Sequence, residues 1–314
     1  MVENDQNQNP LTRDVIRAIE DNDIERVTEV LSQDPPITDA SWLNEPMFLV
    51  HVSAAVYEGK IPAGTNEYAM AKALLKAGAD VDFFDGYPLA AAVSYNAPHV
   101  VRALLESGAS VNGTDNDGVP MAYTLFFGST TVSELLVEWG ANIDLRFAAG
   151  IGDLDRVKSY FKADGSLKPG AGALADPYGH EWKRSNGTVY RCERSPENIL
   201  SQALLYACLN NRLQVAEHLI QHGVDVNAMV PDLGEGEWTI LHRLATNGNF
   251  GATANPSDVE QQRLGAVNFL LEHGADVSIR DPKFKATPLQ WAKHFGCERI
   301  AEILDKHGGA SELV

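Results

Sequence analysis

The feature of the sequence that most constrains its fold is a pair of short helices predicted between Thr287 and Gly308. Thr287 is a residue type that caps helices, and Pro288 would occupy the first helical position, where a missing backbone N–H costs nothing. Gly296 breaks this helix, and a second set of apolar residues follows at helical spacing until Gly308. Neither helix is long enough to be stable alone, so the pair is predicted to need a neighbour on each side.

Related segments recur along the chain. A Thr-x-Leu-His-x-x-Ala segment starts at Thr239, and Gly-Ala-Asp-Val or a close variant occurs at Gly108–Val111 and Gly274–Val277. Units that repeat in this way bury a core by stacking on their neighbours, which predicts an array of similar helix pairs. Four units keep a step of 21 residues from the first residue to the closing glycine, and they start at Tyr87, Val119, Gln202 and Thr287.

These segments resemble the ankyrin-repeat family, whose repeats have a period of about 33 residues and a Thr-Pro-Leu-His-x-Ala signature. The resemblance is specific because the signature and the glycine closure recur together, and it extends over most of residues 11–311. It implies an all-α fold, namely an ankyrin-repeat solenoid of about eight helix pairs with short hairpin and loop connections.

The predicted domain organisation is a single solenoid over residues 11–311. A polar N-terminal tail (1–10) is expected to be disordered, and a short tail (312–314) follows the array. Arg13–Leu31 is predicted to form an N-terminal capping repeat, in which Asn22 replaces the usual glycine between the helices. Irregular loop insertions are predicted at about 60–66, 163–198 and 250–263.

The insertion at 163–198 has two interpretations. From Arg156 to Arg194 there are eight Lys or Arg residues against four Asp or Glu, and such charged stretches usually form a solvated face. Alternatively, the segment binds a partner, because long loops in compact repeats are often functional. In that case Trp182, Lys183 and Arg184 are the candidate contact residues.

The overall composition argues against several classes of partner. The formal charge is −18, from 43 acidic and 25 basic residues, whereas contacts to nucleic acid or to an anionic membrane need a basic face. The most apolar stretch, Met47–Tyr57, is too short to span a bilayer, and the polar N-terminus does not resemble a signal peptide. The three cysteines are scattered, which favours a reducing, cytoplasmic setting.

No motif in the sequence points to catalysis. His218 and His222 have a metal-compatible i, i+4 spacing but no third ligand, and His222 lies where the family ends a helix, so a structural role is favoured. For His242 the resemblance implies a hydrogen bond between neighbouring turns. Aspartates such as Asp153 are typical of helix starts. We therefore expect no catalytic residues, no metal and no cofactor.

The resemblance also implies which residues face a partner. In an ankyrin array the two positions after the Ala-Ala of each first helix face a concave groove, and hairpin tips project, which here include Glu235–Trp238 and Phe284. Some of these aromatic residues are expected to pack into the core instead, including one of Phe126 and Phe127. The groove and tip candidates are Tyr57, Phe84, Asp85, Tyr95, Asp115, Asp117, Phe126, Phe127, Ile151, Asn210, Asn247 and Phe295.

The sequence therefore predicts a non-enzymatic protein–protein interaction module, monomeric alone, that binds another protein through its concave groove and hairpin tips. The expected hot spot spans repeats three to five, with Asp115 and Asp117 selecting a basic residue. The alternative is a regulatory or substrate-recruiting subunit that docks on an enzyme and modulates it. A third alternative is an enzyme that uses the insertion at 163–198.

Overall fold

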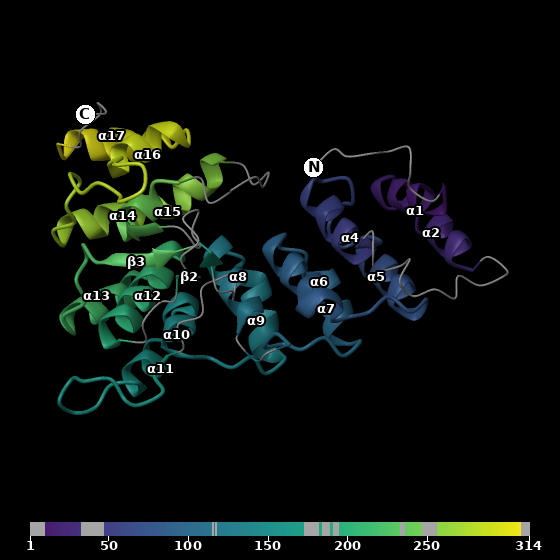
Figure 1. Cartoon of the computed structure of the whole chain (residues 1–314), viewed down its shortest axis with the longest axis horizontal. Helices are drawn as coiled ribbons and strands as arrows, with labels where there is room; N and C mark the ends of the chain where they lie inside the picture. Colours follow the sequence, from purple (N-terminus) through teal and green to yellow (C-terminus); the bar gives the residue numbers. More distant parts are fainter. Residues whose placement is uncertain are drawn as a thin grey trace. The chain divides into compact units, whose positions relative to one another are not determined.

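A computed structural model of the chain describes residues 10–32, 47–114, 116, 118–172, 182–183, 189–190, 195–232, 236–246 and 256–308. Within these ranges the secondary structure is mainly helical, with two short antiparallel strand pairs (Figure 1). The predicted all-α fold class is confirmed. No helix in the described ranges combines the length and the apolar character needed to cross a bilayer.

The helices follow one another in pairs, as the repeated segments predicted. In chain order the pairs are α1 (Pro10–Glu20) with α2 (Ile24–Leu31), α4 (Phe48–Tyr57) with α5 (Glu67–Lys76), α6 (Phe83–Ser94) with α7 (Pro98–Leu105), α8 (Val119–Phe127) with α9 (Thr130–Glu138), α10 (Leu145–Ile151) with α11 (Leu154–Ser159), α12 (Pro196–Leu209) with α13 (Leu213–Gln221), α14 (Ile240–Leu244) with α15 (Pro256–Glu272), and α16 (Pro288–His294) with α17 (Glu298–Lys306).

The turn inside most pairs is made by a glycine or an asparagine in the left-handed conformation. Gly152 and Gly296 have φ values of 88° and 70°, and Asn22 has the same kind of conformation at 56°. Asparagine tolerates this region better than other side chains do, which explains how Asn22 replaces glycine in the first repeat. The predicted turn at Asn22 is confirmed.

Local sequence also sets the start of several helices. At α16 the Thr287 hydroxyl accepts from the Gln290 backbone N–H, and the Gln290 side chain accepts from the Thr287 N–H, which completes a capping box before Pro288. Asp144 caps α10 and Asp153 caps α11 in the same way through a side-chain oxygen. The structural interpretation of Asp153 is therefore confirmed.

The chain divides into two compact units. Unit 1 is Met1–Thr124 with Thr131–Ala141, and unit 2 is Leu125–Thr130 with Asn142–Val314. In unit 1, α1 packs on α4 and α4 on α6, while α2 packs on α5 and α5 on α7. In unit 2 the first helices α10, α12, α14 and α16 pack in that order, and the second helices α11, α13, α15 and α17 do the same (Figure 1). A single array over residues 11–311 stays a prediction.

The structure corrects the extent of two predicted insertions. Ser195 caps α12 and Pro196 is its first residue, so the end of the insertion predicted at 163–198 is helical. Helix α15 begins at Pro256, so much of the loop predicted at 250–263 is an N-terminal extension of the second helix. Proline is favoured at a first helical position, and both boundaries follow from that preference. The loop predicted at 60–66 lies between α4 and α5.

Two strand pairs accompany the helices. Strand β1 (Trp182–Lys183) pairs with β2 (Val189–Tyr190) inside the insertion, and β3 (Met229–Asp232) pairs with β4 (Gly236–Thr239) directly before α14. The second hairpin brings Trp238 opposite Val230. Because β4 runs directly into α14, this hairpin positions Trp238 at the beginning of that repeat.

The cysteines of the described ranges lie in the core. Cys208 and Cys297 are buried, and burial raises the pKa of the Cys208 thiol to about 12 and that of the Cys297 thiol to about 11. A protonated, buried thiol is a poor nucleophile. Both residues therefore act as small apolar side chains.

Candidate partner-binding surfaces

Unit 1 exposes an aromatic residue at the start of α6. Within residues 80–88, here called the Phe84 tip, the Phe84 side chain is 71% exposed and Tyr87 is also exposed. Phe84, Asp85 and Gly86 have successive φ values of 50°, 56° and 78°, which form a short left-handed turn. Non-glycine residues rarely adopt this conformation, and here it turns Phe84 and Asp85 out to solvent.

Unit 2 exposes an aromatic residue at the matching position of the last described repeat. Within residues 280–288, here called the Phe284 tip, the Phe284 side chain is 58% exposed. Its ring lies nearly parallel to the Trp238 ring, with the centroids 6.1 Å apart and the planes at 15°. One face of the phenylalanine is therefore supported by the hairpin before α14.

A buried carboxylate holds the Phe284 tip in place. Asp281 is fully buried, and its side chain accepts hydrogen bonds from the backbone N–H groups of Lys283, Phe284 and Ala286. It also accepts from the Trp291 indole N–H, at 3.1 Å. A carboxylate that accepts several N–H bonds forms charge-assisted bonds of fixed geometry. The Asp281 side chain thus anchors the backbone of the tip at several points.

Buried aromatic rings lie beneath the tip. Trp291 is only 6% exposed, and its ring centroid is 4.5 Å from that of Trp238. Phe295, a predicted groove residue, is partly exposed with its centroid 5.8 Å from Trp291. Exposed Phe284 and partly exposed Phe295 therefore both pack against Trp291.

His242 links the Phe284 tip to the preceding repeat. Its ring is fully buried, and Nε2 donates to the Ala286 carbonyl oxygen at 3.1 Å, while Nδ1 accepts from the Thr239 hydroxyl at 2.7 Å. The hydrogen bond between neighbouring turns that the resemblance implied is confirmed. Burial lowers the pKa of His242, so the neutral ring is favoured in the folded state.

Two predicted groove residues meet in unit 1. The Tyr57 and Tyr95 rings, at the C-terminal ends of α4 and α6, have centroids 5.3 Å apart. Both side chains are partly exposed, and burial raises the pKa of Tyr95. The pair forms an aromatic surface between consecutive first helices.

The two phenylalanines at the end of α8 have different environments in unit 2. Phe126 is 2% exposed, with the Arg243 guanidinium 4.4 Å from its ring centroid, whereas Phe127 is partly exposed. The prediction that one of them faces the core is confirmed, and Phe126 is that residue. Its candidacy as a contact residue is corrected, because packing beneath Arg243 removes its ring from the surface.

Two further groove candidates also lie in unit 2. The Asn210 side-chain amide donates to the Leu125 and Tyr206 carbonyl oxygens, so it joins two repeats. Ile151 is partly exposed at the end of α10. Trp182 and Lys183 form β1. The remaining candidates lie outside the described residues, and they are Asp115, Asp117, Arg184 and Asn247.

The histidines at helix ends have structural partners. The Nδ1 atoms of His222, His273 and His307 each donate to the carbonyl oxygen four residues earlier, in the last turn of the helix. The favoured structural interpretation of His222 agrees with this bond. Within the described ranges, no group of three or more His, Cys, Asp or Glu residues is placed to bind a metal ion.

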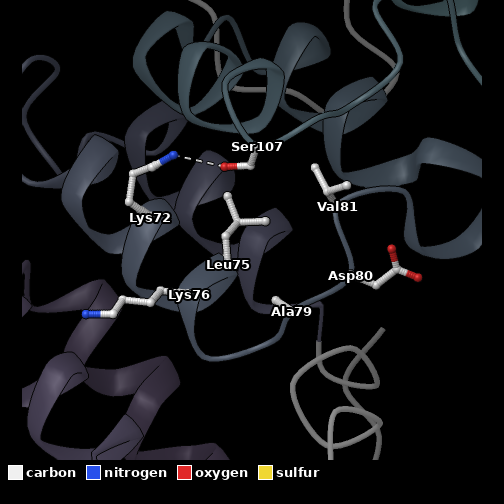
Figure 2. Close-up of a pocket in the computed structure, with 7 residues that line it drawn as sticks. All are labelled: Lys72, Leu75, Lys76, Ala79, Asp80, Val81 and Ser107. Carbon is white, nitrogen blue, oxygen red and sulfur yellow. Dashed lines mark hydrogen bonds between the residues drawn. The ribbon is translucent and has the colours of Figure 1, made fainter.

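A pocket of about 400 Å³ opens between α5 and the end of α7 in unit 1 (Figure 2). The Lys72 ammonium donates to the Ser107 hydroxyl at 3.0 Å, whereas Lys76 and Asp80 extend away from each other (Figure 2). Small-molecule sites need several polar groups that converge on the ligand. The charged groups of this pocket do not converge, so it is a weak candidate for such a site.

Comparisons with known proteins agree with this architecture. Two family models described as ankyrin repeats match the chain, one of three copies over residues 61–147 and one of many copies over residues 204–253. The stacked helix pairs define a helical-repeat protein. Residues 61–147 and 204–253 thus match ankyrin repeats, and ankyrin repeats are generally protein–protein interaction modules.

Two individual similarities were also found. The Caenorhabditis elegans ankyrin repeat and KH domain-containing protein mask-1 is 26% identical over 238 residues, which span 70% of this chain and 8% of that protein. The chain thus covers only a small part of this relative. The human ASB11 ankyrin repeat domain has a TM-score of 0.40 and 18% identity, over 95% of this chain and 98% of that structure.

Most of the chemistry of the Phe284 tip was not predicted from the sequence. Phe284 was implied as a hairpin tip, but Lys283, Lys285 and the buried Asp281 were not among the candidates. The sequence does contain a signal that marks the two tips as equivalent. Residues 80–89 and 280–289 align without a gap up to a shared Pro-Leu, and both segments have phenylalanine at the same position.

Proposed function

We propose that this chain is a non-enzymatic interaction module that binds segments of other proteins through its exposed hairpin tips and the adjacent ends of its first helices. The observation that carries the proposal is the exposure of Phe84 and Phe284 at matching repeat positions. Aromatic residues, including phenylalanine, are enriched at protein–protein interfaces relative to the rest of the surface.

Both tips have a defined conformation, which supports this function. Phe84 projects from a left-handed turn and Phe284 from a turn held by Asp281, so neither needs a large rearrangement to meet a partner. Binding by a pre-ordered side chain loses less conformational entropy than binding by a flexible one. In unit 1 the Tyr57–Tyr95 pair adds aromatic surface, and in unit 2 Phe127 adds more.

The test uses the full chain as bait, with co-purifying proteins identified by mass spectrometry and affinities measured with each purified partner. We expect Phe84→Ala or Phe284→Ala to weaken binding by more than about fivefold, as for typical hot spots, while the melting temperature stays nearly unchanged. Trp139→Ala is the matched control, because Trp139 is an exposed aromatic residue outside both tips. Wild-type affinity in both tip variants would refute the tip-binding function.

The same experiment addresses the regulatory alternative. If the captured partner is an enzyme, its rate is measured with and without a saturating amount of this chain. A changed rate that is restored by the tip variants would identify a modulating subunit. An unchanged rate would leave simple binding as the function.

A further inference from the structure

The two exposed tips carry opposite charges at matching positions. Asp80 corresponds to Arg280 and Asp85 to Lys285, because the two segments align without a gap. The Phe84 tip contains three aspartates and no basic residue. The Phe284 tip contains three basic residues and a single aspartate. The phenylalanine is common to both, so the charge around it distinguishes the tips.

The charge of the Phe284 tip is presented to solvent. Lys283 and Lys285 flank Phe284 and both are exposed, with the Lys283 ammonium 5.1 Å from the Phe284 ring centroid. Asp281, the acidic residue of the tip, is buried and accepts four N–H donors. Its carboxylate therefore does not face a ligand at the surface.

A third basic residue stabilises the same loop. The Arg280 guanidinium donates to the Lys285 carbonyl oxygen at 2.7 Å and lies 3.4 Å from the Gln290 side-chain oxygen. This contact holds the backbone of Lys285, whose φ of 57° turns the chain at the tip. The backbone of Lys285, which follows Phe284 in the loop, is thus held in a defined conformation.

This basic tip occurs in a chain with a formal charge of −18. An acidic segment is repelled by most of such a protein and attracted only where basic residues gather. Complementary charge speeds association and sets specificity more than it adds affinity. The effect acts over about 8–10 Å at physiological salt, which is comparable to the size of a hairpin tip.

We propose that the Phe284 tip binds an acidic protein segment, in which Asp or Glu residues flank an apolar side chain. The apolar side chain packs on Phe284 beside Trp238, and the flanking carboxylates pair with Lys283 and Lys285. The Phe84 tip disfavours the same segment, because Asp85 stands where Lys285 stands in unit 2. The inference rests on the proposed function and names the chemistry of one partner.

The test is a selection of displayed random 12-residue peptides on the full-length chain. Selected peptides are synthesised with a fluorescent label, and their affinities are measured for wild type, Phe284→Ala and Phe84→Ala. We expect peptides that lose at least tenfold in affinity with Phe284→Ala to be enriched in Asp and Glu. The same peptides should bind Phe84→Ala within twofold of wild type.

Charge variants isolate the electrostatic part. Lys283→Glu/Lys285→Glu should weaken the acidic peptides at least tenfold, and Lys283→Gln/Lys285→Gln should weaken them less. Both lysines are exposed, so circular dichroism and melting temperature should match wild type in either variant. Raising the salt concentration should weaken the wild-type complex and have a smaller effect on the Gln variant, since screening acts on the charges.

Several outcomes would overturn the inference. Phe284-dependent peptides that are neutral or basic, or acidic peptides that bind the Glu variant as tightly as wild type, contradict it. Peptides that bind only surfaces away from Phe284 contradict it but leave the proposed function intact, whereas failure to select any peptide counts against both. Tight binding of a labelled single-stranded DNA 12-mer that depends on Lys283 would show that the tip recognises phosphates instead.

Discussion

The Phe84 tip and the Phe284 tip expose the same side chain but are stabilised differently. In unit 1 the turn consists of three left-handed residues, and no side chain caps the start of α6. In unit 2 the turn is held by Asp281, a capping box at Thr287 and the hydrogen bond from His242. The first tip therefore depends on backbone conformation, and the second depends on buried side chains.

This difference shows that a repeat can keep its binding position while changing what supports it. Val81 occupies the position of Asp281 in the other tip and is partly exposed. Its hydrocarbon side chain offers no acceptor for the N–H groups of the loop. Removing a support should therefore affect one tip and not the other.

Trp291→Ala should have the largest effect. The indole is buried against Trp238 and donates to Asp281, so its loss leaves a cavity beneath the Phe284 tip. Loss of a core tryptophan destabilises by about 3–5 kcal/mol. Because repeats couple mainly to their neighbours, hydrogen exchange should rise in α14–α17 and stay unchanged at the Phe84 tip. An equal rise in both units would contradict local support.

Asp281→Ala should destabilise unit 2 by about 2–4 kcal/mol, because four N–H donors lose a charged acceptor. Val81→Ala is the matched variant in unit 1 and should change the unfolding free energy by less than about 1 kcal/mol, as for a partly exposed side chain. Urea denaturation followed by circular dichroism measures both. Similar losses would mean that Asp281 is not the support of its tip.

Gly86→Ala and Ala286→Gly should show the reverse asymmetry. Gly86 has a φ of 78°, and an alanine in the left-handed region is disfavoured by about 1–2 kcal/mol. Ala286→Gly should cost only about 0.5–1 kcal/mol, chiefly through the greater freedom of the unfolded chain. Thermal melts of the two variants test the comparison. If Gly86→Ala were neutral, the Phe84 turn would not require its left-handed glycine.

Lowering the pH should weaken the Phe284 tip. Burial lowers the pKa of His242 in the folded state, so the unfolded chain takes up its proton first as the pH falls below the ordinary histidine value. The contribution of neutral His242 to the unfolding free energy is thus fully present above the ordinary histidine pKa. It is lost as the pH falls through the lower pKa of the folded state. Asp281 opposes the shift, which makes this the smallest of the four effects.

His242→Gln supplies the control, because glutamine does not titrate. Burial and His222 also lower the pKa of His218, so His218→Asn is needed to remove a second contribution of the same sign. Thermal melts between pH 7.5 and 5.5 avoid most carboxylate titration. The pH dependence of unit 2 should be smaller in His242→Gln, and an unchanged dependence would exclude His242 as its source.

The sequence by itself determined the helix pairs and several of their ends. Thr287, Pro288 and Asn22 act on the backbone within a few residues, so capping and turn preferences located these boundaries without knowledge of the neighbours. The role of His242 was also available, because it belongs to the repeat signature. These features depend on local sequence, and the structure bears them out.

Only the tertiary structure decided which side chains remain at the surface. Phe126 and Phe127 are adjacent and identical, yet Arg243 from another repeat covers the first. The ring of Phe284 stacks on Trp238, and the carboxylate of Asp281 accepts a hydrogen bond from the Trp291 indole N–H. Such contacts join residues far apart in sequence, and local propensity carries no information about them because it extends over only a few residues.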